Sequence, residues 1–120
     1  MCHQIATTDS PEHKQFTKRT VVYKRVNPKN DHFTNIYSRY GTKRYRLGQN
    51  ANIPKGAETS NGRDSVHGIY VYRTLTGARA APWDGRVILK CEVKPKDLLT
   101  VSKSGWAATY RTVKPVAVVR

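Results

Sequence analysis

Tyrosine and basic side chains alternate over a short stretch in the first half of this sequence. The stretch reads Tyr37-Ser38-Arg39-Tyr40-Gly41-Thr42-Lys43-Arg44-Tyr45-Arg46. Arginine and lysine neutralise phosphates, and tyrosine rings stack on exposed bases, so the combination suits single-stranded nucleic acid or RNA. The alternative interpretation is that the tyrosines pack in the core while the arginines are solvated. We predict binding, with contacts from Arg39, Tyr40, Lys43, Arg44, Tyr45 and Arg46.

The charge of the chain supports this interpretation. Its 120 residues include 22 Lys and Arg against 8 Asp and Glu, which gives a formal net charge of +14. Residues 14–46 contain ten of the basic side chains and a single acid, Asp31. Such a concentration of one sign is typical of a phosphate-facing surface. The expected partner is DNA, RNA or a nucleoprotein, and the surface would be extended by Lys18, Arg19, Lys24 and Arg25. An acidic protein surface, with this protein as its inhibitor, is an alternative partner.

Other site chemistries have weaker patterns. The four histidines and two cysteines are scattered, without the short paired spacings of zinc sites, so no metal is expected. Residues 64–67 bring Asp, Ser and His together, but catalytic triads are assembled by the fold, and no Gly-x-Ser-x-Gly turn is present. The segment 52–63 lacks P-loop spacing, although its Lys55 and Arg63 are candidates to line an anion site. We predict no catalytic residue.

The length of the chain fits one domain. We expect a flexible N-terminal arm over residues 1–17 and one globular domain over residues 18–120. No run approaches the roughly 20 apolar residues of a membrane span, and the opening residues lack the apolar core of a signal peptide. Cys91 lies in an apolar run and is expected to be a buried thiol. These features predict an intracellular protein, in the cytoplasm or the nucleoid or nucleus of a host cell, without a membrane partner.

The elements that must position these side chains are short. We expect strands over residues 20–26, 68–73 and 86–93, a hairpin within residues 33–47, and further strands after residue 97. Asn27-Pro28 should end the first strand, and Thr74 should cap a short helix that ends before Pro82. Residues 48–67 are expected to form a loop, and Trp106 is interpreted as a structural residue. The predicted class is α+β, with a mostly antiparallel, strongly bent sheet of about seven strands and one or two short helices.

Residues 67–101 resemble part of the ADP-ribosyltransferase fold, in its poly(ADP-ribose) polymerase branch. The resemblance rests on the strand Gly68-Ile69-Tyr70-Val71, on a short helix with Ala78, Ala80 and Ala81, and on the apolar strand Val87–Val93. The same block is similar to segments of small phage and viral proteins, for which no activity is implied.

The resemblance implies an enzyme that uses NAD in a cleft around Tyr70, whose ring would stack on the nicotinamide, with Tyr72 nearby. It also implies a glutamate on a late strand, to stabilise the oxocarbenium-like transition state. Residues 106–112 contain no carboxylate, and Glu92 and Asp97 are the nearest acids in sequence. We therefore expect a small, basic, non-catalytic, nucleic-acid-binding accessory protein of viral or phage type, without a cofactor. The alternative is an NAD-dependent, ADP-ribosyltransferase-like enzyme.

Overall fold

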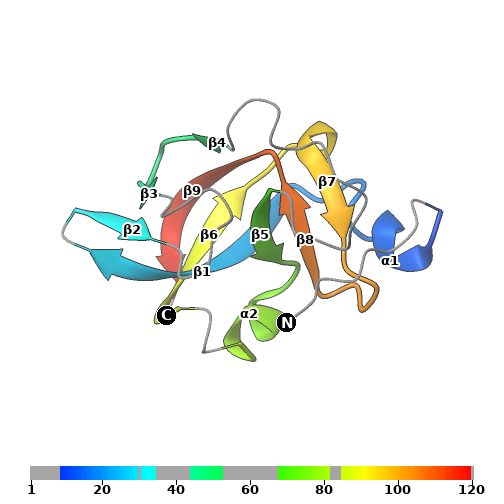
Figure 1. Cartoon of the computed structure of the whole chain (residues 1–120), viewed down its shortest axis with the longest axis horizontal. Coiled ribbons are helices and arrows are strands. Elements are labelled where there is room, and N and C mark those ends of the chain that lie inside the picture. Colours follow the sequence, from blue (N-terminus) through cyan, green and yellow to red (C-terminus); the bar gives the residue numbers. More distant parts are fainter. Residues whose placement is uncertain (1–8, 30, 35–43, 53–67, 82–84, 120) are drawn as a thin grey trace.

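The structure is a computed structural model, which describes residues 9–29, 31–34, 44–52, 68–81 and 85–119. Within them the chain forms one curved sheet, with two short helices, α1 (Pro11–Lys14) and α2 (Leu75–Arg79), and a 3-10 turn, η2 (Pro95–Asp97) (Figure 1). The strands are β1 (Val21–Lys29), β2 (His32–Thr34), β3 (Arg44–Tyr45), β4 (Ala51–Asn52), β5 (Ile69–Tyr72), β6 (Val87–Glu92), β7 (Leu98–Val101), β8 (Ala107–Tyr110) and β9 (Thr112–Val119). No helix in these ranges is long and apolar enough to cross a membrane.

All strand pairs are antiparallel, and the main order is β4-β9-β6-β1-β5-β8-β7. The outer part of β1 pairs with β2, which pairs with β3. This arrangement confirms the predicted α+β class and the mostly antiparallel sheet. The described residues form nine strands rather than about seven. One reason is that β4, only two residues long, lies in the segment predicted as a loop.

Two prolines lie inside strands, and the first of them, Pro28, stands where the sequence predicted the end of a strand. Pro28 lies in the outer part of β1, beyond Val26, the last β1 residue that pairs with β6. Pro115 lies in β9 opposite Cys91, at a register shift in the β6–β9 pairing. A proline lacks the backbone donor that an inner strand needs, and an edge or a bulge does not require that donor. The local geometry therefore tolerates both residues.

Strand β1 alternates between the two faces of the sheet. Val22, Lys24 and Val26 are buried, whereas the residues between them are only half-buried. The first three point into the main core, which also holds Cys91. That thiol is fully buried, as predicted, and burial raises its pKa to about 12. On the other face α2 packs over a smaller core, and the Thr74 hydroxyl accepts from the Gly77 N–H (3.0 Å), which confirms the predicted helix cap.

The segment before β1 departs from the predicted flexible arm. Ser10 caps α1 by accepting a hydrogen bond from the His13 N–H (3.2 Å), and Phe16 is fully buried in the main core. The prediction is therefore wrong for the end of the segment, and residues 1–8 lie outside the described residues. Phe16 is a single apolar residue among polar ones, so it gave no periodic signal in the sequence.

Candidate nucleic-acid interface

Lys24, predicted to contact phosphates, lies in the interior. Its side chain is 7% exposed on the core face of β1, and its Nζ donates to the Tyr70 carbonyl (2.7 Å). The same Nζ lies 5.8 Å from the centre of the Tyr45 ring, within the range of a cation–π interaction. These contacts link β1, β3 and β5 in the core. Lys24 is thus a structural cation, and its assignment to the interface is corrected.

Tyr45, predicted to stack on a base, is also buried. It is 2% exposed, belongs to the main core and lies opposite Phe33 in the β2–β3 pairing. Burial, the larger cause, and the nearby Cys91 raise the pKa of its phenol. A base cannot stack on a ring that is covered in this way, so the structure favours the alternative of a tyrosine packed in the core.

Arg25 holds the second face of the sheet together. Its Nε donates to the Gly85 carbonyl (2.8 Å) and its Nη1 to the Ala78 carbonyl (3.1 Å). The first contact reaches Gly85, two residues before β6, and the second reaches the last turn of α2. These two bonds occupy the guanidinium with backbone acceptors, which makes Arg25 a positioning residue for α2 rather than a phosphate contact.

The outer part of β1 and the strands β2 and β3 form a ribbon, defined by residues 27–29, 31–34 and 44–46, which projects to the left in Figure 1. Arg44 and Arg46 are exposed on it, as predicted. The Arg46 Nη2 lies 3.6 Å from the Asp31 Oδ2. The pKa of Asp31 is lowered, first by its hydrogen bond with His32 and then by Arg46. The predicted contacts Arg39, Tyr40 and Lys43 lie outside the described residues.

A second group of cations gathers where several strand ends meet. Val21 at the start of β1 lies opposite Glu92 at the end of β6. Glu92 in turn lies opposite Lys114 in the first half of β9. The Val93 N–H donates to the Thr20 carbonyl (2.9 Å), which ties the segment before β1 to the segment after β6. Residues from three distant parts of the sequence are therefore neighbours.

The junction of β8 and β9 completes this group. Arg111 is the single residue between the two strands, and its N–H donates to the Asp97 carbonyl in η2 (2.8 Å). The end of β6, the start of β7 and this junction lie side by side at the top of Figure 1. We call the resulting surface the basic end, which consists of Lys18, Arg19, Lys94, Lys96, Arg111 and Lys114.

The basic end carries a local excess of positive charge. Arg19 is half-buried, whereas the other five cations are exposed. Two acids, Glu92 and Asp97, accompany these six cations. Within the described residues no ion pair joins either acid to a cation, and the ion pairs there involve Asp31. Among the described residues, cations therefore outnumber acids at the basic end.

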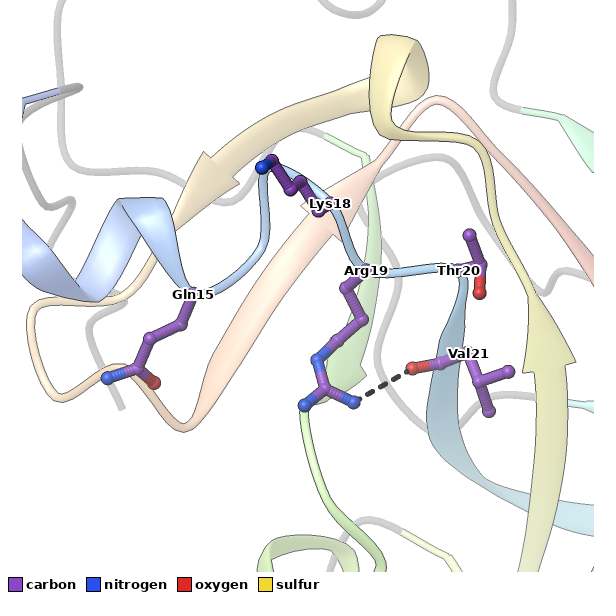
Figure 2. A pocket seen from close by; sticks show the side chains of 5 residues that line it. All are labelled: Gln15, Lys18, Arg19, Thr20 and Val21. Atoms are coloured by element: carbon purple, nitrogen blue, oxygen red, sulfur yellow. Dashed lines mark hydrogen bonds between the residues drawn. The ribbon is translucent and has the colours of Figure 1, made fainter.

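Arg19 and Lys18 border an open hollow of about 380 Å³, which Gln15, Thr20 and Val21 also line (Figure 2). The Arg19 Nη1 donates to the Val21 carbonyl (3.3 Å). Its Nε is buried without a hydrogen-bond partner among the described residues, as is the hydroxyl of Tyr110. Burial raises the pKa of Tyr110 to about 12, against the lowering effect of Arg19. The protein itself therefore covers part of this guanidinium.

The cleft implied by the ADP-ribosyltransferase resemblance is only partly described. Tyr70 is half-buried, Tyr72 is 8% exposed, and the two rings meet edge to face with centroids 5.5 Å apart. Tyr72 lies opposite Tyr23, two residues along β1 from the position that Glu92 faces. The other predicted cleft residues, Lys55 and Arg63, lie outside the described residues.

Comparisons with known proteins add no assignment. No protein-family model, no curated protein and no solved structure matches this chain. Within the described ranges no three His, Cys, Asp or Glu side chains gather in a way that would hold a metal ion.

The sequence predicted a positive surface within residues 14–46, which leaves out four members of the basic end, Lys94, Lys96, Arg111 and Lys114. Their only signal was the milder basic excess after residue 46. Lys24, in contrast, carried a usable signal. It alternates with Val22 and Val26, and that period of two already placed it on the core face.

Proposed function

We propose that this protein binds nucleic acid, with the phosphate backbone as its main contact and the basic end as its main surface. The observation that carries the proposal is the meeting of six cations and two acids at one end of the sheet, in a chain of net charge +14. Phosphates are the most abundant anions that such a surface can neutralise, and counterion release makes their binding favourable at low salt. The proposal includes no catalytic step.

The arrangement of the cations supports a polyanion over a single small anion. They come from the segment before β1, the segment around η2, and the β8–β9 region, so they spread over several strand ends. A backbone that repeats its charge at regular intervals matches such a spread better than one phosphate does. Arg19 and Lys18 also line the hollow next to this surface.

The test is the salt dependence of binding by the full chain. A labelled single strand and a duplex of about 20 nucleotides are titrated at several salt concentrations. If all six cations contact phosphates of the single strand, the log–log slope of affinity against salt should approach about −4. Polyglutamate of similar length is the control for an acidic protein partner. Absence of binding to both nucleic acids at low salt would overturn the proposal, and tight binding to polyglutamate alone would favour the protein partner.

We further expect no transfer of ADP-ribose. Cleavage of the nicotinamide–ribose bond leaves positive charge on the sugar, and a fixed carboxylate is the expected stabiliser. Residues 106–112 contain none, and Glu92 is exposed opposite Lys114. Incubation with labelled NAD and with protein or nucleic-acid acceptors should leave all of them unlabelled. Turnover that disappears in Glu92→Gln or Asp97→Asn would contradict this expectation and establish the enzyme instead.

A further inference from the structure

Trp106 is a large aromatic side chain that the fold leaves partly exposed to solvent. Its side chain is 48% exposed, which exceeds the exposure of Leu47 (46%) and Val118 (40%), the other exposed large apolar residues of the described ranges. It lies in the loop between β7 and β8, at residues 102–106. Packing inside the protein therefore covers about half of the Trp106 surface, and the other half faces solvent.

The inner side of the Trp106 ring rests on Gly77 of α2. A Cβ at position 77 would lie 2.9 Å from Cε3 and 3.4 Å from Cζ3 of Trp106, so only glycine allows the ring to lie this close. Glycine is among the least favourable residues in a helix, yet it occupies the middle of a five-residue helix here. The contact between Gly77 and Trp106 explains this glycine, because the absence of a side chain lets the ring pack against the helix.

The backbone around Trp106 is held on both sides. The Arg73 N–H donates to the Trp106 carbonyl (2.8 Å), and the Arg73 Nε donates to the Gly105 carbonyl (3.0 Å). Ser102 closes the loop, because its N–H donates to the Ala107 carbonyl (2.9 Å) and its carbonyl accepts from the Gly105 N–H (3.0 Å). The ring is therefore presented in one orientation rather than left to move freely, which lowers the entropy lost when a ligand stacks on it.

Charged side chains of both signs lie next to the loop that carries this ring. Arg73 contacts the loop directly, and Lys103 is exposed at its other end. A Cβ at Gly105 would lie 3.3 Å from the Cγ of the acid Glu12 and 3.6 Å from the Gln15 Oε1. Gln15 lines the hollow together with Lys18 and Arg19 (Figure 2). The loop is thus adjacent, through Gln15, to two cations of the basic end. An exposed aromatic ring can stack on a flat base, and cations near it can contact the phosphates on either side of that base.

We propose that Trp106 is a stacking platform for a base of single-stranded nucleic acid. The phosphates that flank this base lie against Lys103 on one side and against Lys18 and Arg19 on the other. This inference rests on the proposed nucleic-acid binding and adds to it a preference for strands with unpaired bases. Stacking on aromatic side chains tolerates any base, because every base has a flat face, so the preference is for single strands rather than for a sequence.

The test separates stacking from charge by comparing two strands of the same phosphate number. One probe is oligo-dT of about 20 nucleotides, and the other is an abasic strand of equal length. The wild-type chain should bind oligo-dT about 5- to 100-fold more tightly than the abasic strand. Trp106→Leu should remove this difference and leave both the affinity for the abasic strand and the salt slope unchanged. Leu47→Ala, which removes a similarly exposed apolar side chain elsewhere, is the matched control and should change neither.

Each outcome decides between the two proposals. If Trp106→Leu weakens both strands equally, or neither, the stacking platform is wrong, while salt-dependent binding of the abasic strand still supports the proposed function. If the wild-type chain binds neither strand at low salt, both proposals fail. A second measurement covers the case in which Trp106→Leu does not fold. In a Trp83→Phe chain, Trp106 is the only tryptophan, and oligo-dT should quench its fluorescence where the abasic strand does not. Equal response to the two strands would also overturn the platform.

Discussion

The ribbon and the basic end are both rich in cations, but they differ in how those cations are brought together. In the ribbon the basic side chains are close in sequence, and the alternation of tyrosine and arginine made them conspicuous. There the structure turns Tyr45 into the core and places Asp31 beside Arg46. In the basic end the cations come from residues 18 to 114, and pairing of strand ends makes them neighbours.

This difference shows what an alternating basic and aromatic pattern indicates. A short strand with one buried face and one solvated face needs a large apolar side chain at every second position and a polar one between them. Arg44, Tyr45 and Arg46 meet that requirement without any ligand. An excess of charge at a place where strand ends converge has no such structural explanation, because like charges at close range destabilise the fold.

The largest expected effect separates the core role of Tyr45 from a role in stacking. Tyr45→Ala should lower the free energy of unfolding by about 3–5 kcal/mol, because it removes a buried ring and the surface beneath the Lys24 ammonium. Chemical denaturation measures the loss. Tyr45→Phe, which keeps the ring, should retain most of the stability. Affinity of the folded fraction for a single strand should change by less than about twofold. If Tyr45→Ala instead has normal stability but loses the preference for unpaired bases, Tyr45 is part of the interface after all.

A matched pair of triple variants compares the two surfaces directly. Lys18, Lys94 and Lys96 are replaced by Ala in one chain, and Lys29, Arg44 and Arg46 in the other, so both lose three positive charges. The variant of the basic end should bind a single strand about 10- to 100-fold more weakly at low salt, with a slope reduced by about two. The variant of the ribbon should lose less than about fivefold, because Asp31 already compensates one of its cations.

The outcome of this comparison bears on the location of the site. Equal losses in the two chains would mean that net charge alone attracts the strand, without a defined surface. A larger loss of affinity in the ribbon variant would mean that the ribbon, as the sequence predicted, is the main contact with the strand. Thermal unfolding of both chains serves as the control for folding, and little change is expected because the replaced side chains are exposed.

Much of the fold could be predicted from the sequence, because the strongest strands have local signals. Residues 69–72 and 87–92 are rich in β-branched and aromatic side chains, and Thr74 marks the start of α2. The alternation in β1 also separates the residues of its two faces. The interior position of Lys24 was not predicted, because its charge suggested a surface role.

The remaining features depend on contacts between distant residues, for which a single sequence has no signal. Gly77 and Trp106 meet across 29 positions, so neither the glycine in the helix nor the half-exposed ring could be interpreted locally. The segments that contain Lys18 and Lys94 are joined by the hydrogen bond between Thr20 and Val93. The register of β6 on β1 and β9 fixes which cations share a surface, and that register is a property of the whole sheet.

The smallest expected effect concerns Asp31, which restrains the ribbon. Its carboxylate lies 3.1 Å from the His32 Nδ1 and 3.6 Å from the Arg46 Nη2, and these partners hold its pKa below the ordinary value of 3.8. A carboxyl group with a lowered pKa stabilises the fold above the ordinary value, and this stabilisation is lost as the pH falls through the lowered one. Asp31→Asn should therefore be slightly less stable than wild type at neutral pH, and the two melting temperatures should converge as the pH falls below 3.8 and through the lowered pKa. The same variant releases Arg46 and should bind a single strand up to about threefold more tightly at neutral pH. A gain above about tenfold would make the ribbon a major phosphate contact, whereas a loss of affinity would mean that Asp31 positions Arg46 for the strand rather than competing with it.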